Sequence, residues 1–297
     1  RLAQACDQGI AALLVDLKLS GLVGLAPLRS FMKRCLRLGR ALPIHRAATG
    51  VDHIFTFHAA FVGQPGTGKT VCAQLLADLL FEAGLIKRRK AVVVGARQLV
   101  GQYVGKTDPL VRATVAQAVG GVLFIDEAYM LATSRDSRDY GREAVATLIE
   151  LMEKHRGELV VIFAGYETDI KQLLASNPGL RSRVPRENIV KFPEFDTTEA
   201  YEALCEMAAK SKVNVHPLCR HIWSDLAVLH QMPTTGREVR NLFDGLLAGP
   251  SAMRTGVDRC ALRIEPSDFA EIKLRRRQST RELSAKKMAM PTDDEVN

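Results

Sequence analysis

The stretch GQPGTGKT at positions 63–70 decides the fold, because it fits the phosphate-binding pattern G-x-x-x-x-G-K-[ST] at every fixed position. Glycines in such a stretch let successive backbone N–H groups point at phosphate oxygens. The lysine supplies a positive charge for the β- and γ-phosphates, and the threonine hydroxyl is a ligand for Mg²⁺. An apolar strand pattern precedes the stretch and an apolar helix pattern follows it, as this mechanism requires. The residues expected to hold a nucleotide are Gly63, Pro65, Gly66, Thr67, Gly68, Lys69 and Thr70.

A second motif, VLFIDE at positions 122–127, is an apolar run that ends in two adjacent carboxylates. A buried strand does not end in two charges unless they meet something cationic. We expect Asp126 and Thr70 to hold Mg²⁺, with Asp126 acting through water, and Glu127 to orient and polarise the attacking water. Acidic turns after strands are common, so this motif gains its weight from the phosphate-binding stretch. Together the two motifs predict a site that hydrolyses ATP or GTP.

Strand and helix patterns alternate around both motifs, which favours a parallel sheet covered on both faces. After residue 195 the pattern becomes helical: Asp196 and Glu199 form an N-cap and N3 pair, and an apolar face follows Thr235. We predict an α/β domain over residues 1–195, with a helical segment at 1–50, a small α-helical domain over 196–272 and a tail over 273–297 without sustained periodicity. The expected strands are Ile54–Val62, Ala91–Gly95, Gly121–Asp126, Glu158–Gly165 and Asn188–Phe192, and the expected helices between them are Thr70–Ala83, Pro109–Val119 and Arg142–His155.

Composition excludes several classes of protein. The 297 residues are 47% hydrophobic and 25% charged with a formal net charge of +8, which is ordinary globular usage and not that of a disordered or collagen-like chain. The apolar runs are too short to cross a bilayer. Six scattered cysteines without a Cys-x-x-Cys pair indicate a reducing compartment and no metal site. The first residue is arginine, so we expect a processed or truncated chain. Basic residues near both ends could touch nucleic acid, although solvated surface charge is the commoner reading.

Further motifs resemble one family, the AAA+ ATPases of the CbbX/CfxQ and SpoVK branch, which includes red-type rubisco activase. The resemblance runs from about residue 22 to 272. The residues that carry it are LVGL at 22–25, LVGQYVG at 99–105, Gly120 through Tyr129, DYGREA at 139–144, AGY at 164–166, NPGLRSR at 177–183 and GREVRN at 236–241. The stretch at 134–138 departs from the CbbX pattern.

The resemblance implies roles for residues around the nucleotide. Val23 and Gly24, which could otherwise form a plain apolar turn, match a box that lies against adenine. Arg237 matches the sensor-2 arginine that links nucleotide state to movement of the helical lid; a solvated arginine is the alternative. Tyr166 ends the strand at the sensor-1 position, where many AAA+ proteins carry asparagine, so its hydrogen bond to water or phosphate stays open.

The resemblance also implies residues that act beyond their own subunit. It places an arginine finger, which reaches the γ-phosphate of the neighbouring subunit, at Arg183 first and Arg181 second, in a loop after a helix at 170–175. Tyr103, Val104 and Gly105 match a pore loop whose aromatic ring grips a polypeptide. A tyrosine packed at a domain edge is the alternative reading of Tyr103.

These expectations combine into one function: a Mg²⁺-ATP-hydrolysing ring, expected to be a hexamer and to be formed with itself or a close paralogue, that remodels a protein client. The resemblance implies rubisco as that client, with release of inhibitory sugar phosphates, in a bacterial cytoplasm or in the plastid stroma of a red-lineage alga. Three alternatives stay open: a SpoVK-like ATPase with another client, a nucleotide-dependent switch or scaffold that does not thread protein, and a nucleic-acid motor.

Overall fold

The structure is a computed structural model that describes residues 15–16, 19–50, 56–103, 105–132, 140–228, 233–248 and 263–269. The chain divides into two compact units, one ending at Glu194 and the other beginning at Phe195. The predicted tail at 273–297, the 134–138 stretch and Val104 lie outside the described residues. No helix among those described is long and apolar enough to cross a membrane.

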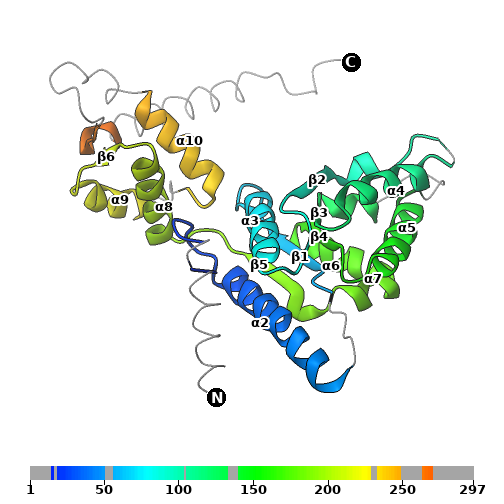
Figure 1. Cartoon of the computed structure of the whole chain (residues 1–297). Helices are drawn as coiled ribbons and strands as arrows, with labels where there is room; N and C mark the ends of the chain where they lie inside the picture. The colour runs from blue at the N-terminus through cyan, green and yellow to red at the C-terminus, as the bar shows by residue number, and fades with distance from the viewer. Residues whose placement is uncertain are drawn as a thin grey trace, which may run out of the picture. The chain divides into compact units, whose positions relative to one another are not determined.

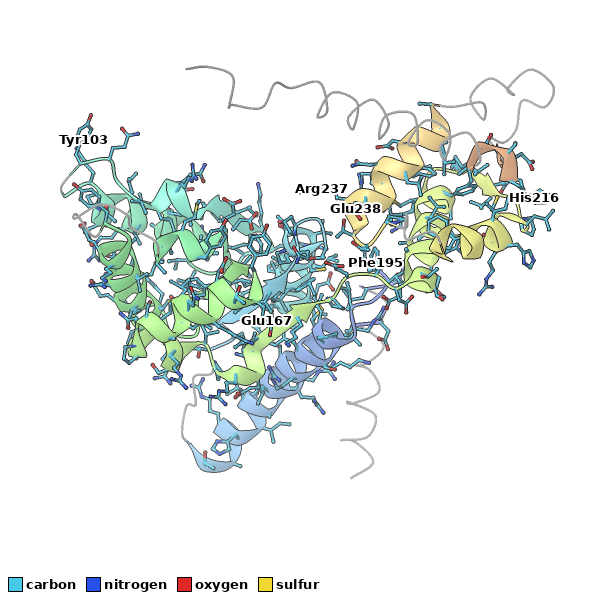
Figure 2. All side chains as sticks on the ribbon, turned by 180° about the vertical axis from the view of Figure 1, so that it is seen from behind. Tyr103, Glu167, Phe195, His216, Arg237 and Glu238 are labelled. Carbon is cyan, nitrogen blue, oxygen red and sulfur yellow. The ribbon has the colours of Figure 1, made fainter. Side chains whose placement is uncertain are left out.

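The first unit is built on one sheet of five parallel strands, in the order β2-β3-β4-β1-β5. Helices cover both faces of this sheet (Figure 1; Figure 2 shows the unit from behind). This confirms the predicted α/β fold with a flanked parallel sheet. The strands are β1 (Ala59–Gly63), β2 (Ala91–Gly95), β3 (Val122–Asp126), β4 (Val160–Gly165) and β5 (Ile189–Phe192), and the helices are α2 (Ala26–Thr49), α3 (Lys69–Glu82), α4 (Thr107–Ala118), α5 (Tyr140–Lys154), α6 (Glu167–Ser176) and α7 (Pro178–Arg183).

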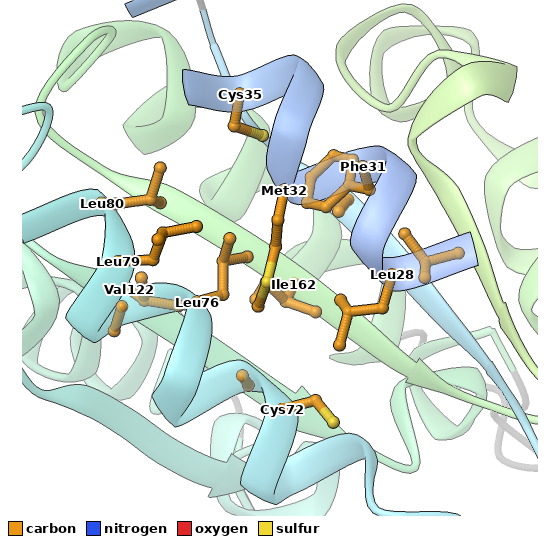
Figure 3. Packing of buried hydrophobic residues seen from close by; sticks show 14 of the residues in the cluster. Leu28, Phe31, Met32, Cys35, Cys72, Leu76, Leu79, Leu80, Val122 and Ile162 are labelled. Atoms are coloured by element: carbon orange, nitrogen blue, oxygen red, sulfur yellow. The ribbon is translucent and has the colours of Figure 1, made fainter. Parts of the chain in front are cut away.

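Alternate strand residues enter two separate cores, because successive side chains of a strand point to opposite faces. On one face, Phe61, Phe124 and Ile162 pack with α2 and α3. Figure 3 shows this packing, with Leu28, Phe31 and Met32 of α2 opposite Leu76, Leu79 and Leu80 of α3. On the other face, Leu123, Val161 and Phe163 pack with side chains of α4 to α7. A sheet buried on both faces explains why its strands read as continuous apolar runs.

The strand order decides which residues meet at the functional edge. β4 lies between β1 and β3 and pairs with both, Val62 with Gly165 and Ile125 with Phe163. Because all strands are parallel, the phosphate-binding stretch, the Asp126-Glu127 pair and Tyr166 all follow carboxyl ends of strands at one edge of the sheet. Ligands of open parallel sheets bind at this edge.

Among its described residues, the second unit contains the helices α8 (Thr197–Lys210), α9 (Cys219–Val228) and α10 (Gly236–Leu247). Asp196 caps α8 as predicted: its carboxylate accepts from the Glu199 backbone N–H at 2.8 Å, and the Glu199 carboxylate accepts from the Asp196 N–H at 3.0 Å. The expectation of helices alone is wrong, since β6 (Asn214–Val215) and β7 (Arg263–Ile264) pair in parallel. Two-residue strands are too short to show a period in the sequence.

Candidate nucleotide-binding and catalytic site

The phosphate-binding stretch forms a tight loop between β1 and α3. Gly66 and Gly68 have φ of +85° and +90°, which side chains rarely adopt. A side chain at Gly63 would strike the carbonyl oxygen of Phe192 in β5. Lys69 is only 9% exposed, and its Nζ donates to the carbonyl oxygens of Gly63 and Gln64, both at 2.8 Å. The loop therefore holds the positive charge of Lys69 at the phosphate-binding stretch, which suits phosphate.

The two carboxylates after β3 lie in different backbone conformations. Asp126 is the last strand residue, is partly buried, and accepts from the Glu127 N–H at 3.0 Å. Glu127 has φ +51° and ψ +38° and is exposed. A left-handed residue other than glycine costs on the order of 1–3 kcal/mol and concentrates at active sites. The backbone of Asp126 still belongs to the strand, whereas that of Glu127 turns out of it. The two carboxylates can therefore serve separate roles.

Two tyrosines stand beside this turn. Tyr166 follows β4 and caps α6, and its ring centroid lies 6.1 Å from that of Tyr129. A Cβ placed on Gly165 would lie 3.2 Å from Cδ1 of Tyr129, so the Tyr129 ring packs against the end of β4. Burial, followed by the charge of Glu127, raises the pKa of Tyr129. The sequence reasoning assigned Tyr129 no role, although an aromatic two residues after a catalytic carboxylate was the available signal.

The Val23-Gly24 segment lies just before α2. Gly24 has φ +72°, and the next residue, Leu25, is buried. Leu25 belongs to the same core cluster as Cys72 and Ala73 of α3, the helix that begins at the phosphate-binding loop. The turn is therefore tied to the core on which that loop rests. Its contact with adenine stays a prediction.

Arg181 and Arg183 do not lie in a loop, and that expectation is wrong. They lie on the short helix α7, which begins at Pro178 because the Asn177 side chain accepts from the backbone N–H of Gly179 at 2.8 Å. Arg181 is exposed and has no partner among the described residues. Arg183 is half-buried and forms an ion pair with Glu153 of α5 at 2.9 Å.

The Tyr103 turn follows β2 and a short 3₁₀ helix, η1 (Ala96–Leu99). Tyr103 is 69% exposed and points away from the body of its unit (Figure 2). Gly105 has φ +74° with open space where a Cβ would lie. The Thr107 hydroxyl accepts from the Gly101 N–H at 3.1 Å and fixes the base of the turn. Within the described residues of this chain, the Tyr103 side chain is therefore mostly exposed, and its place in a pore loop stays a prediction.

Arg237 lies in the first turn of α10 in the second unit (Figure 2). The Thr235 hydroxyl caps this helix by accepting from the Glu238 N–H at 3.3 Å. The buried face of α10 is formed by Val239, Leu242, Phe243 and Leu246, and Arg237 is exposed. A positive charge at a helix N-terminus is electrostatically unfavourable unless an anion compensates it.

The oxygen atoms near the loop suit a small hard cation. Thr70 is exposed at the start of α3, and Asp126 is partly buried at the end of β3. Within the parts of the chain that the structure describes, no group of three or more His, Cys, Asp or Glu side chains could form a metal cage. Mg²⁺ in nucleotide sites takes only one or two protein ligands together with phosphates and water. The residues present therefore fit a nucleotide-bound Mg²⁺.

Comparison with known proteins identifies the class of protein that this fold and site define. Residues 59–191 match the model of the AAA family, ATPases associated with various cellular activities. A solved RuvB mutant of Thermotoga maritima superposes with a TM-score of 0.57 at 17% identity, over 84% of this chain and 69% of that one. An AAA domain of FIGL-1 in complex with ADP gives 0.54 at 20% identity, over 93% and 86%. The fold and the phosphate-binding loop thus define an AAA+ ATPase that hydrolyses ATP.

Curated relatives narrow this class. Protein CfxQ of Xanthobacter flavus is 36% identical over 230 residues, 75% of this chain and 71% of that protein. The plasmid CbxX of Cupriavidus necator is 38% identical, over 80% and 75%. The chloroplastic ribulose bisphosphate carboxylase/oxygenase activase of Cyanidioschyzon merolae is 47% identical over 142 residues, 48% of each chain. The chain belongs to the CbbX/CfxQ family of AAA+ ATPases.

Proposed function

We propose that this ATPase assembles into a ring, a hexamer of itself or of itself and a close paralogue, and uses ATP hydrolysis to pull on a protein client. The observation that carries the proposal is Tyr103, a large aromatic side chain left 69% exposed on a turn in which Gly105, two residues later, has φ +74°. An exposed aromatic contacts polypeptide of any sequence through apolar area. Val104 and Gly105 complete this pore loop, and Gly105 lets it swing.

Within one subunit, the roles follow from the edge of the sheet. The loop at 63–70 and Lys69 bind the phosphates, and Val23 and Gly24 lie against the adenine. Thr70, and Asp126 through water, would hold Mg²⁺, which when bound would neutralise charge on the β- and γ-phosphates. Glu127 orients the attacking water and accepts its proton. Tyr166 contacts that water or the γ-phosphate.

Two arginine positions outside the phosphate-binding loop complete the cycle. Arg183, with Arg181 as the second choice, supplies positive charge to the γ-phosphate bound by the neighbouring subunit, which makes hydrolysis depend on ring assembly. Arg237 compensates its unfavourable place at a helix N-terminus by binding phosphate, and so links nucleotide state to the second unit.

The proposed client is red-type rubisco, from which the ring would release inhibitory sugar phosphates. The similarity to the ribulose bisphosphate carboxylase/oxygenase activase of Cyanidioschyzon merolae supports this client. The compartment would then be a bacterial cytoplasm or a plastid stroma. A SpoVK-like client and a nucleotide-dependent scaffold are the outcomes against which the test is set.

The test uses red-type rubisco inactivated by bound ribulose bisphosphate, with carboxylation measured after addition of this protein and Mg²⁺-ATP. Recovery that requires ATP hydrolysis supports the proposal. Hydrolysis that proceeds while rubisco stays inhibited overturns rubisco as the client. Salt-dependent binding to DNA or RNA would instead favour the nucleic-acid motor.

A further inference from the structure

Arg183 is held from two sides within its own subunit. Its Nη2 donates to Oε2 of Glu153 at 2.9 Å, and its Nη1 donates to the carbonyl oxygen of Gly179 at 3.0 Å. These acceptors come from α5 and from the first turn of α7. A planar guanidinium bound through two different nitrogens has a defined orientation as well as a defined position. The side chain is 23% exposed, so one part of it still faces outward.

His58 lies close to Arg183 and is fully buried. Its Nδ1 accepts from the Val161 N–H of β4 at 3.0 Å, so the proton of the neutral ring is on Nε2. Nε2 of His58 and Nε of Arg183 are both buried donors without an acceptor among the described residues. The His58 ring therefore offers Arg183 no acceptor, and the orientation of the guanidinium is left to Glu153 and Gly179.

Hydrogen bonds connect the residues around His58. The Asn188 Nδ2 donates to the His58 carbonyl oxygen at 2.7 Å, and Nη2 of Arg34 on α2 donates to the Asn188 Oδ1 at 2.6 Å. Three elements distant in sequence thus meet at the start of β1.

We propose that Glu153 is a positioning residue for the trans arginine: it holds the Arg183 guanidinium on α7 so that the arginine is presented to the nucleotide of the neighbouring subunit. This inference rests on the proposed role of Arg183 in trans. Glu153 is 56% exposed, and its Oε1 also lies 3.6 Å from Arg156. An exposed ion pair without such a role would contribute little to the stability of the protein.

Helix α5 offers a matched control one turn earlier. Glu150 is equally exposed, at 56%, and pairs with Arg112 at 2.8 Å, remote from Arg183 in its contacts. Glu153→Gln removes the charge that orients Arg183, whereas Glu150→Gln removes a charge of the same kind from the same helix. Arg156→Ala removes the second partner of Glu153 and shows whether that partner matters.

In the assembled ring we expect Glu153→Gln to lower kcat for ATP about 10- to 100-fold, because misplacement of a catalytic charge by about 1 Å has effects of this size. The KM for ATP should change less than about twofold, since the nucleotide loop of the variant is intact. Glu150→Gln and Arg156→Ala should stay within about twofold in kcat. Glu153→Asp keeps the carboxylate one methylene short and should recover part of the rate. Circular dichroism and sedimentation check that each variant folds and assembles.

Mixed rings assign the defect to the arginine. Glu153→Gln subunits mixed with Glu127→Gln subunits should regain activity, because intact arginines then reach intact catalytic carboxylates. Glu153→Gln mixed with Arg183→Ala should regain none, because neither subunit presents a placed arginine.

The outcomes separate this inference from the proposed function. Full activity of Arg183→Ala overturns the trans role of Arg183 itself. Loss in Arg183→Ala with a normal or faster Glu153→Gln enzyme overturns only the positioning role, and a faster enzyme identifies Glu153 as a restraint. Equal loss in Glu150→Gln, or no recovery in Glu153→Asp, overturns it as well.

Discussion

In the sheet of the first unit, the edge at which the strands end (the carboxyl edge) differs from the edge at which they begin (the amino edge). The carboxyl edge carries short contiguous motifs, positive φ angles at Gly66, Gly68 and Glu127, and the exposed carboxylate of Glu127. The amino edge carries His58 and Arg183, which lie far apart in sequence, are buried or half-buried and are enclosed by hydrogen bonds. The carboxyl edge has backbone strain and exposed polar groups where a ligand would react. At the amino edge, hydrogen bonds fix the positions of the side chains. We infer that chemistry belongs to the first edge and subunit communication to the second.

The largest effect is expected from removing Arg183, the residue of the amino edge that is proposed to act on a nucleotide bound at the carboxyl edge of the neighbouring subunit. Arg183→Ala should lower ATP hydrolysis about 10³- to 10⁵-fold if it acts as a trans arginine, because such residues contribute rate factors of this size. Arg181→Ala, on the same short helix but without a partner among the described residues, is the matched comparison. Phosphate release should be measured over a wide dilution series, where the wild-type rate per chain rises as rings assemble. A rate per chain that stays flat on dilution argues for a self-contained monomer.

A somewhat smaller effect is expected at the carboxyl edge itself. Glu127→Gln should bind ATP but hydrolyse it about 10²- to 10⁴-fold more slowly, since it loses the group that orients and deprotonates water. Lys69→Ala should instead lose ATP affinity, because it removes the buried charge of the phosphate loop. Fluorescence titration with a nucleotide analogue and steady-state phosphate release separate the two defects. Near-normal turnover by Glu127→Gln would refute its assignment.

What the sequence could predict differs between the same two edges. The loop at 63–70, the pair after β3 and the parallel sheet were predictable because each is encoded within a few neighbouring residues. The amino edge was not, because the Glu153–Arg183 pair joins residues 30 positions apart. α7 was missed since Pro178 and Gly179 suggest a loop, whereas the Asn177 cap makes a helix start there. His58 reads in sequence as an ordinary residue before a strand, and only the fold buries it.

The Tyr103 turn is a third region. Its aromatic side chain is exposed, whereas the residues of both edges are held by hydrogen bonds or packing. Tyr103→Ala should lower the amount of rubisco reactivated per ATP hydrolysed by at least about tenfold, since removal of an aromatic anchor often abolishes most of a contact's affinity. Gln102→Ala, the exposed neighbour, is the control. The measurement is carboxylation recovered against phosphate released in the same assay. If Tyr103→Ala loses hydrolysis in proportion and unfolds at a lower temperature, the tyrosine has a structural role instead.

The smallest effect tests whether the amino edge is as closed as its contacts indicate. Burial, followed by the positive charge of Arg183, lowers the pKa of His58 from 6.5 to about 4. The unfolded chain therefore binds a proton at His58 that the folded chain does not, and stability from this group is present above pH 6.5 and lost as the pH falls toward 4. Between pH 6.5 and about pH 5.5 this loss amounts to about 1 kcal/mol of the free energy of unfolding.

His58→Asn should remove this pH dependence, because an uncharged amide can accept from the Val161 N–H in place of Nδ1 without binding a proton. Urea unfolding followed by circular dichroism at both pH values gives the free energies. The comparison uses the difference between the two pH values and not absolute stability, because the smaller side chain also leaves a cavity with its own cost. An unchanged acid dependence in His58→Asn would show that solvent reaches His58, and the amino edge would then not be as closed as its hydrogen bonds indicate.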